Sequence, residues 1–340
     1  VLANAYVVGT GDNSIHALVE NSIGDLVPLA LSSFPTNPRP VALALHPSRN
    51  FLYAANLTSN TVAGFSIDHT NGVLAPIGTA LPPTPVGSNP VSLGVNSGGQ
   101  FLFVLNQGSV SPAAPASISV FSIDPTRGLL TPVGGAPTAA NPQFLAVSPT
   151  AGVLYVSNGS LGTISGFVIG SGGALSEMAG SPFAAGGTIA GLTIDPKGQF
   201  LYAADSANSK IASFTIQSSG ALTPVAGSPF TTGLGPVAVA VNGTATLLFS
   251  ANQVGESVSA FKISSGALTP VAGSPFPLVS IGTPTPTFLT VDNSNTFLYV
   301  ANQGTTNISG FTIGSDGVLT PLATSPFTVG VGPQWIVITP

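Results

Sequence analysis

The stretch that decides the fold is FLYAADSANSKIASFTIQSSGALTPVAGSPF, at residues 200–230. It contains one apolar segment at Phe200-Leu201-Tyr202, a second around Phe214 and a third that begins at Leu222. Asn, Ser and Gly separate these segments, and such residues favour turns. Short apolar segments divided by turn residues predict strands that are joined by hairpins.

The same order of segments recurs along the chain at intervals of 47 to 52 residues. The aromatic-centred segment begins at Phe51, Phe101, Val153, Phe200, Leu247 and Phe297. A second landmark keeps step with it, at Phe65, Phe121, Phe167, Phe214, Phe261 and Phe311. Four-stranded repeats of this length are the signature of β-propellers, in which blades stack radially.

The repeat at residues 141–183 shows how one blade is divided. Four strands are expected at residues 143–148, 153–158, 163–169 and 175–179, with turn residues between them. The aromatic residues occupy the same strand position in every repeat, which predicts that they pack one blade against the next rather than bind a ligand.

The whole chain is expected to form an all-β, seven-bladed β-propeller with four antiparallel strands per blade, as a single domain over residues 1–340. The predicted blades are residues 1–36 together with 332–340, then 37–88, 89–140, 141–187, 188–234, 235–283 and 284–331. The N-terminal repeat lacks a first strand, and residues 333–339 match a first strand that nothing follows. Residues 333–339 are therefore expected to pair with the strand that contains Tyr6 and Val8, because the pairing covers open strand edges.

Charged residues make up 5% of the chain, with 6 Lys and Arg and a formal net charge of -5. Six scattered cations cannot form the basic patch that binds nucleic acid. Gly, Pro, Asn or Ser interrupts every apolar run before it reaches the length of a membrane helix, so no membrane span is expected. A surface rich in Ser, Thr, Asn and Gln favours an exported protein, and the start at Val1 fits a chain whose leader has been removed.

No cofactor or metal is expected. Metal sites need clustered carboxylates or imidazoles, whereas Asp12 and Asp205 stand alone in segments between second and third strands, where they are predicted to cap turns. The Gly-rich stretch at residues 170–173 leads into a strand, so it predicts a hairpin turn rather than a phosphate-binding loop.

The segments FLYAAN at 51–56, LYVSN at 154–158, FLYVAN at 297–302 and LTPVAGSPF at 222–230 and 268–276 mark a family resemblance. The chain resembles the seven-bladed lactonase family typified by bacterial 6-phosphogluconolactonase, and the related YVTN-type surface repeats. The resemblance covers essentially the whole chain. It implies a catalytic set that consists of an inner-strand Pro-Arg-His motif and a Glu just after the Asn that ends a second strand.

The best match to that motif is Pro38-Arg39-Pro40, with Pro40 in place of the His. Leu57 stands where the Glu is expected, and the equivalent residues of other repeats are Gln107, Gly159, Gln253 and Gln303. Arg39 is the one retained member of the implied set, so the comparison of motifs predicts no significant lactonase activity.

The three histidines were the remaining candidates for acid and base chemistry. His46 precedes Pro47 at the end of a first strand and is predicted to cap a turn, whereas His16 on a third strand and His69 in a hairpin are predicted to be exposed. Arg39 is a candidate anion ligand at the channel mouth, against the alternative of hydrogen bonds to loop carbonyls.

Two functional interpretations remain at this point. The main one is a non-catalytic secreted or cell-surface propeller that acts in binding, scaffolding or self-assembly. Its expected partners are copies of itself, an extracellular surface or a glycan. The alternative is a lactonase-like hydrolase or cycloisomerase at the central channel, with Arg39 and His46 as its catalytic residues.

Overall fold

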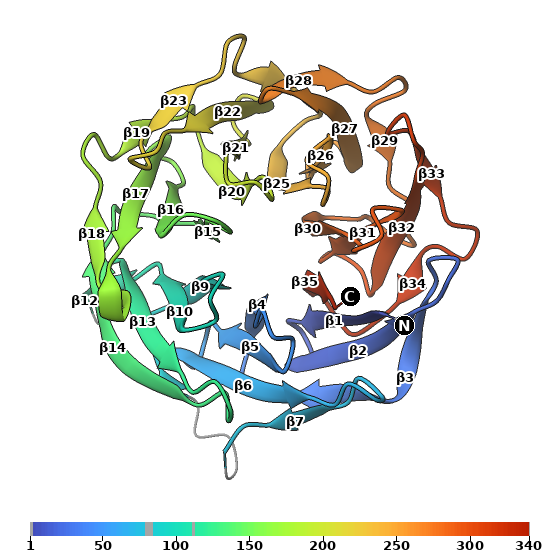
Figure 1. The fold of residues 1–340 in the computed structure, drawn as a ribbon. Coiled ribbons are helices and arrows are strands. Elements are labelled where there is room, and N and C mark those ends of the chain that lie inside the picture. Colours follow the sequence, from blue (N-terminus) through green and yellow to red (C-terminus); the bar gives the residue numbers. More distant parts are fainter. Residues whose placement is uncertain (1–2, 79–83, 111–112, 340) are drawn as a thin grey trace.

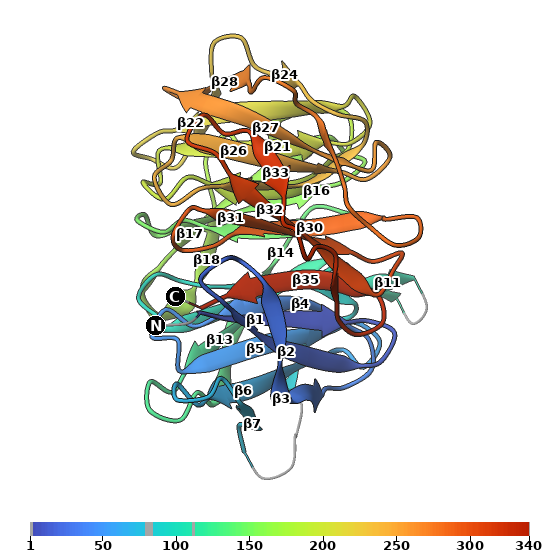
Figure 2. The same cartoon turned by 90° about the vertical axis from the view of Figure 1, so that its right-hand side faces the viewer.

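The computed structural model describes residues 3–78, 84–110 and 113–339. Seven antiparallel sheets, the blades, stand around a central axis (Figure 1), and the same ring is seen edge-on in Figure 2. The chain is therefore an all-β, seven-bladed β-propeller with four main strands per blade, as predicted. Among the described residues, no helix is long and apolar enough to cross a membrane.

The first strands line the axis, and each pairs with the second strand of its blade. The first strands are β4 (Pro40–Leu45), β9 (Pro90–Val95), β15 (Phe144–Val147), β20 (Ile189–Ile194), β25 (Pro236–Val241), β30 (Pro286–Val291) and β35 (Pro333–Ile338). The second strands are β5 (Phe51–Asn56), β10 (Phe101–Asn106), β16 (Val153–Asn158), β21 (Phe200–Asp205), β26 (Leu247–Asn252), β31 (Phe297–Asn302) and β1 (Ala3–Gly9). Blades one to six begin with β4 to β30 in this order, and β1, β2, β3 and β35 form the closing blade.

The third and fourth strands form the outer part of each blade. The third strands are β6 (Thr61–Ile67), β13 (Ser117–Ile123), β17 (Thr163–Ile169), β22 (Lys210–Ile216), β27 (Ser257–Ser264), β32 (Asn307–Ile313) and β2 (Ser14–Glu20). The fourth strands are β7 (Leu74–Pro76), β14 (Leu130–Pro137), β18 (Leu175–Glu177), β23 (Leu222–Pro224), β28 (Ala267–Pro270), β33 (Leu319–Pro321) and β3 (Leu26–Pro35). A small hairpin, β11 (Ser109–Val110) and β12 (Ala113–Ala114), and one 3₁₀ turn, η1 (Ser171–Gly173), lie outside these main strands.

Five blades carry an additional short strand that the sequence analysis did not predict. These strands are β8 (Thr84–Pro85), β19 (Phe183–Ala184), β24 (Phe230–Thr231), β29 (Phe276–Pro277) and β34 (Phe327–Thr328), and each pairs with the third strand of its blade. In blades three to six, the serine of the preceding Ser-Pro-Phe segment accepts a third-strand N–H at 2.8 to 3.0 Å. The serine hydroxyl thus replaces a strand partner where the fourth strand ends, and the Phe resumes the pairing.

The aromatic residues of the second strands form the packing between blades. Tyr6, Tyr53, Tyr155, Tyr202 and Tyr299 are fully buried. Tyr155 of the third blade, for example, packs with Leu192 and Phe214 of the fourth blade in one apolar cluster. The predicted packing role of these residues is confirmed.

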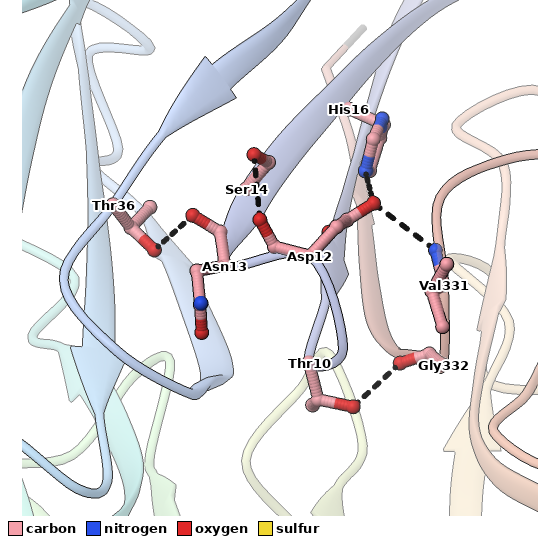
Figure 3. A network of polar contacts seen from close by, with 8 residues as sticks. All are labelled: Thr10, Asp12, Asn13, Ser14, His16, Thr36, Val331 and Gly332. Atoms are coloured by element: carbon pink, nitrogen blue, oxygen red, sulfur yellow. Dashed lines mark hydrogen bonds and ion pairs between the residues drawn. The ribbon is translucent and has the colours of Figure 1, made fainter.

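The ring closes through the two ends of the chain. β35 pairs with β1 in the register Val7 to Ile336, as predicted for residues 333–339. Asp12 supports the closure, because its Oδ2 accepts the Val331 N–H at 3.1 Å and lies 2.8 Å from His16 Nε2 (Figure 3). The Thr10 hydroxyl donates to the Gly332 carbonyl at 3.0 Å. These contacts connect the β1–β2 turn to the segment that leads into β35.

Candidate functional site

A recurring backbone hydrogen bond positions side chains of several blades at one mouth of the central channel. The residue after the second strand donates its N–H to the residue just before the first strand: Leu57 to Arg39 at 2.8 Å, Gln107 to Asn89 at 3.0 Å and Gln253 to Gly235 at 2.8 Å. The acceptor residues have φ of 59°, 56° and 63°, a region that suits Asn and Gly. Two side chains are thereby held near the axis. One belongs to the start of the first strand, and the other belongs to the residue that follows the second strand.

These side chains surround a cavity of about 310 Å³ in the channel. Its polar lining residues are Gln107, Gln143, Gln253, Thr287 and Gln334. Its apolar lining residues are Val41, Val91, Phe144, Ala190, Val237 and Trp335. None of these lining residues is ionisable, so the part of the cavity that the structure describes is neutral and offers mainly amide hydrogen bonds.

Two of the glutamines have amide N–H groups available to a ligand. The Gln303 amide donates to Gln334 Oε1 at 3.2 Å, which orients Gln334 and leaves its Nε2 unpaired within the described chain. The Gln107 side chain has no partner among the described residues. Gln253 makes one long contact, from Nε2 to the Pro286 carbonyl at 3.4 Å. The cavity therefore holds hydrogen-bond donors that the protein itself does not consume.

An aromatic stack forms the apolar wall of the channel. Trp335 of the closing blade lies 4.0 Å from Phe288 of the sixth blade and 5.2 Å from Phe144 of the third blade, between ring centroids. The interplanar angles are 16° and 10°, so the rings are nearly parallel. An aromatic wall beside amide donors is suited to a ligand that has an apolar C–H face and several hydroxyl groups, such as a sugar ring.

The structure corrects the motif alignment at Arg39. The φ of 59° at Arg39 is close to those of Asn89 and Asn141, so Arg39 occupies the position that Asn has in other repeats. Pro40 is therefore the first residue of its strand, as Pro90 is the first residue of β9. Val41, rather than Arg39, therefore occupies the position after that proline. Arg39 is exposed and does not line the cavity, and its backbone N–H donates to Asn13 Oδ1 at 2.7 Å.

The proposed pair of Arg39 and His46 is not brought together. The two residues flank opposite ends of β4, whose six residues span roughly 20 Å at about 3.3 Å per residue. His46 is buried, with Nε2 2.9 Å from the Gly99 carbonyl and Nδ1 3.1 Å from the Ser48 N–H. These contacts connect the first two blades, in agreement with the predicted turn-capping role.

The remaining polar candidates also stabilise turns and loops. His69 is exposed as predicted, with Nε2 2.8 Å from Asn50 Oδ1, whereas His16 is half-buried because it contacts Asp12 at the ring closure. Asp205 ends β21 and accepts the N–H of Asn208 in the following turn at 3.3 Å, so its predicted turn-capping role is confirmed. No group of three or more His, Cys, Asp or Glu residues within the described ranges is arranged to hold a metal ion.

The sequence analysis missed the residues that line the cavity. A signal was present, because Gln follows Asn at the same place in three repeats, at Gln107, Gln253 and Gln303. In the motif comparison these glutamines counted only as replacements of the expected Glu. The stack around Trp335 gave no local signal, because it joins strands that are far apart in sequence.

Comparisons with known proteins identify one family and several solved structures of the same fold. Residues 4–134, 108–188 and 175–277 match the family model described as lactonase, 7-bladed beta-propeller. A putative 6-phosphogluconolactonase from Bacteroides fragilis superimposes with a TM-score of 0.83 and 20% identity, over 100% of this chain and 98% of that one. The periplasmic gluconolactonase of Pseudomonas aeruginosa superimposes with a TM-score of 0.80 and 18% identity, over 100% of this chain and 99% of that one. A protein of unknown function from Desulfotomaculum acetoxidans superimposes with a TM-score of 0.78 and 16% identity, over 98% of each chain. The search of curated proteins found no significant match.

The family match overturns the main interpretation from the sequence. The absence of the Arg, His and Glu motif had favoured a non-catalytic secreted scaffold, and that interpretation is wrong. A match that extends over most of the chain supports the lactonase-like alternative instead. The chain belongs to the seven-bladed β-propeller lactonase family.

Proposed function

We propose that the chain is a lactonase-like hydrolase that opens a neutral sugar lactone in the cavity of the central channel. The observation that supports the proposal most directly is the combination of unpaired amide donors, at Gln107 and Gln334, with the aromatic wall at Trp335. Family membership makes a lactone the first class of substrate to consider. An exported location remains a prediction from the scarcity of charged residues.

The substrate class follows from the charge of the cavity. A phosphorylated sugar would require Lys, Arg or a metal ion near its phosphate group. The described lining residues include no cation. A sugar lactone without phosphate needs only hydrogen bonds to its hydroxyls and contact with its ring, both of which the amides and Trp335 provide.

The proposed chemistry relies on polarisation of the lactone carbonyl. In hydrolysis, a water oxygen adds to the carbonyl carbon, the ring C–O bond breaks, and one water proton ends on the former ring oxygen. The single product is an open-chain hydroxy acid, whose carboxyl group releases its proton to water. Negative charge develops on the carbonyl oxygen as water adds, so N–H donors such as Gln107 and Gln334 stabilise the transition state more than the substrate. No side chain of the described lining is placed to act as a general base.

Removal of one donor should lower the rate without unfolding the protein. Gln334→Leu is expected to reduce kcat/KM for D-glucono-1,5-lactone by up to about 100-fold, the lower part of the range for one oxyanion donor. The matched control is Gln217→Leu, because Gln217 is exposed on the hairpin between β22 and β23, away from the channel. Wild-type protein that does not exceed spontaneous hydrolysis would contradict the proposed function, and equal rates for the two variants would contradict the role of Gln334.

The pH profile tests the absence of a side-chain base. After subtraction of the spontaneous reaction, log(kcat/KM) is expected to be flat or to rise steadily with hydroxide concentration, with no inflection between about pH 5 and 8. The reason is that none of the described lining residues titrates in that range. A bell-shaped profile measured by acid release would show that a titratable group acts in the reaction.

A further inference from the structure

A second cavity lies between the fourth and fifth blades. Its volume is about 330 Å³, which is within the range for small-molecule sites. Asp195, Lys197 and Gln199 line it from the turn between β20 and β21, whereas Ser265 lines it from the β27–β28 hairpin. This turn follows the C-terminal end of a first strand, whereas the channel cavity lies at the opposite, N-terminal ends. The two cavities are therefore separate.

Tyr202 also lines this cavity and differs from the four other tyrosines. Those four hydroxyls each donate to a hairpin glycine carbonyl of the next blade: Tyr6 to Gly72 at 2.9 Å, Tyr53 to Gly128 at 2.9 Å, Tyr155 to Gly220 at 2.6 Å and Tyr299 to Gly24 at 2.7 Å. The Tyr202 hydroxyl has no partner in the described chain, although the residue is 0% exposed. A buried hydroxyl without a partner is unfavourable, so its presence calls for a ligand or a water.

A single residue explains the difference. Ser213 stands opposite Tyr202 in the sheet, whereas Gly166 stands opposite Tyr155 and Gly310 opposite Tyr299. The Ser213 hydroxyl donates to the Gly266 carbonyl at 2.7 Å, and Gly266 is the hairpin glycine that Tyr202 would otherwise use. Ser213 thus occupies that acceptor and leaves the Tyr202 phenol available to the cavity.

The cavity offers several hydrogen-bond donors, and its one carboxylate already accepts several N–H groups. The Asp195 carboxylate already accepts backbone N–H groups of Gln199 at 2.6 Å, Phe200 at 2.7 Å and Lys197 at 3.3 Å. Burial, with a smaller contribution from the Asp195 charge, raises the pKa of Tyr202 above its ordinary range, so the phenol stays protonated and can donate. The Lys197 ammonium, the Gln199 amide and the Ser265 hydroxyl add further donors.

We propose that this cavity binds a small carboxylate anion, with the Tyr202 hydroxyl donating a hydrogen bond to it and the Lys197 ammonium balancing its charge. Charge-assisted hydrogen bonds to a carboxylate are stronger than those to a neutral acceptor. The three backbone N–H groups on Asp195 partly offset the charge of that residue and reduce its repulsion of the ligand. This site is independent of the proposed lactone chemistry.

The composition of the chain permits a direct test by ¹⁹F NMR. The protein has 5 Tyr and 1 Trp, so labelling with 3-fluorotyrosine gives one signal per tyrosine, and 5-fluorotryptophan reports on Trp335 alone. Titration with sodium D-gluconate at constant ionic strength is expected to shift the Tyr202 signal saturably, while the Tyr155 signal stays unchanged. The Tyr202 signal is assigned by its loss in Tyr202→Phe. Any binding in the channel appears separately at Trp335.

Calorimetry on two variants completes the test. Tyr202→Phe and Lys197→Gln are each expected to weaken gluconate binding at this site by about tenfold or more, the effect of losing a hydrogen bond to a charged group. Tyr155→Phe, whose hydroxyl is already paired with Gly220, is the control and should bind as the wild type does. The proposal fails if the Tyr202 signal does not move with gluconate or acetate, or if D-glucose or inorganic phosphate moves it equally well. It also fails if Lys197→Gln binds normally.

Discussion

Replacement of Ile336 by alanine is expected to lower the free energy of unfolding by about 2 to 5 kcal/mol, the usual cost of truncating a buried Ile. Ile336 is 0% exposed and lies in β35, opposite Val7 of β1. It belongs to the cluster of buried residues that includes Tyr299 and Ile308 of the sixth blade, so it connects the closing blade to its neighbour. Urea unfolding followed by circular dichroism measures the change.

The matched control is Val331→Ala. Val331 precedes the same strand but is 53% exposed, so its truncation should change the free energy of unfolding by no more than about 0.5 kcal/mol. A loss for Ile336→Ala that does not exceed the loss for Val331→Ala would mean that the terminal strand does not contribute to the stability of the ring.

The repeat made the architecture predictable from sequence. Residues 153–158 and 163–169 were predicted as strands, and β16 and β17 have these bounds. The closure was predictable too, because residues 333–339 match a first strand that the N-terminal repeat lacks. The short strands such as β19 were not predicted, because two-residue pairings depend on the geometry of the Ser-Pro-Phe segment rather than on an apolar pattern.

The candidate site was less predictable, for two physical reasons. The motif alignment placed Pro38 at the start of the first strand, with Arg39 as the next residue. The positive φ at Arg39 shows that the strand begins one proline later, at Pro40. A backbone angle of this kind is not visible in a single sequence. The aromatic wall joins Phe144, Phe288 and Trp335 only after the ring has closed. Contacts of this kind are determined by the circular arrangement of blades, not by local spacing.

Glu20 creates the largest expected pH effect on stability. Glu20 is 6% exposed at the junction between the closing and sixth blades, where its Oε1 lies within hydrogen-bond distance of the Tyr299 hydroxyl, at 3.0 Å. Burial above all, and the nearby Asp292 charge to a lesser extent, raise the pKa of Glu20 from 4.5 to about 7, against the opposing effect of the hydrogen bond with Tyr299. The folded protein therefore holds a proton on Glu20 at pH values where the unfolded chain has released it.

The sign of the effect follows from this difference in proton binding. Between about pH 4.5 and 7 the folded state binds more protons than the unfolded state, so the contribution of Glu20 to stability falls as the pH rises. Above about pH 7 the full cost of a buried carboxylate is present. A pKa shift of one unit corresponds to about 1.4 kcal/mol, so the shift of the Glu20 pKa corresponds to a loss of about 3 kcal/mol in the free energy of unfolding.

Glu20→Gln removes the titrating group and keeps an amide that can hydrogen-bond with the Tyr299 hydroxyl. The variant is expected to match the wild type near pH 4.5 and to exceed it by up to about 3 kcal/mol at pH 8, measured by urea unfolding across the pH range. Glu177→Gln is the control, because Glu177 is exposed and its replacement should leave the pH dependence unchanged. If Glu20→Gln and Glu177→Gln run parallel to the wild type at every pH, the Glu20 carboxyl is not protonated in the folded protein near neutral pH. If the difference in stability between Glu20→Gln and the wild type grows between about pH 4.5 and 7 and stays constant above pH 7, the group that titrates is Glu20 at the blade junction, because its pKa is raised into that range.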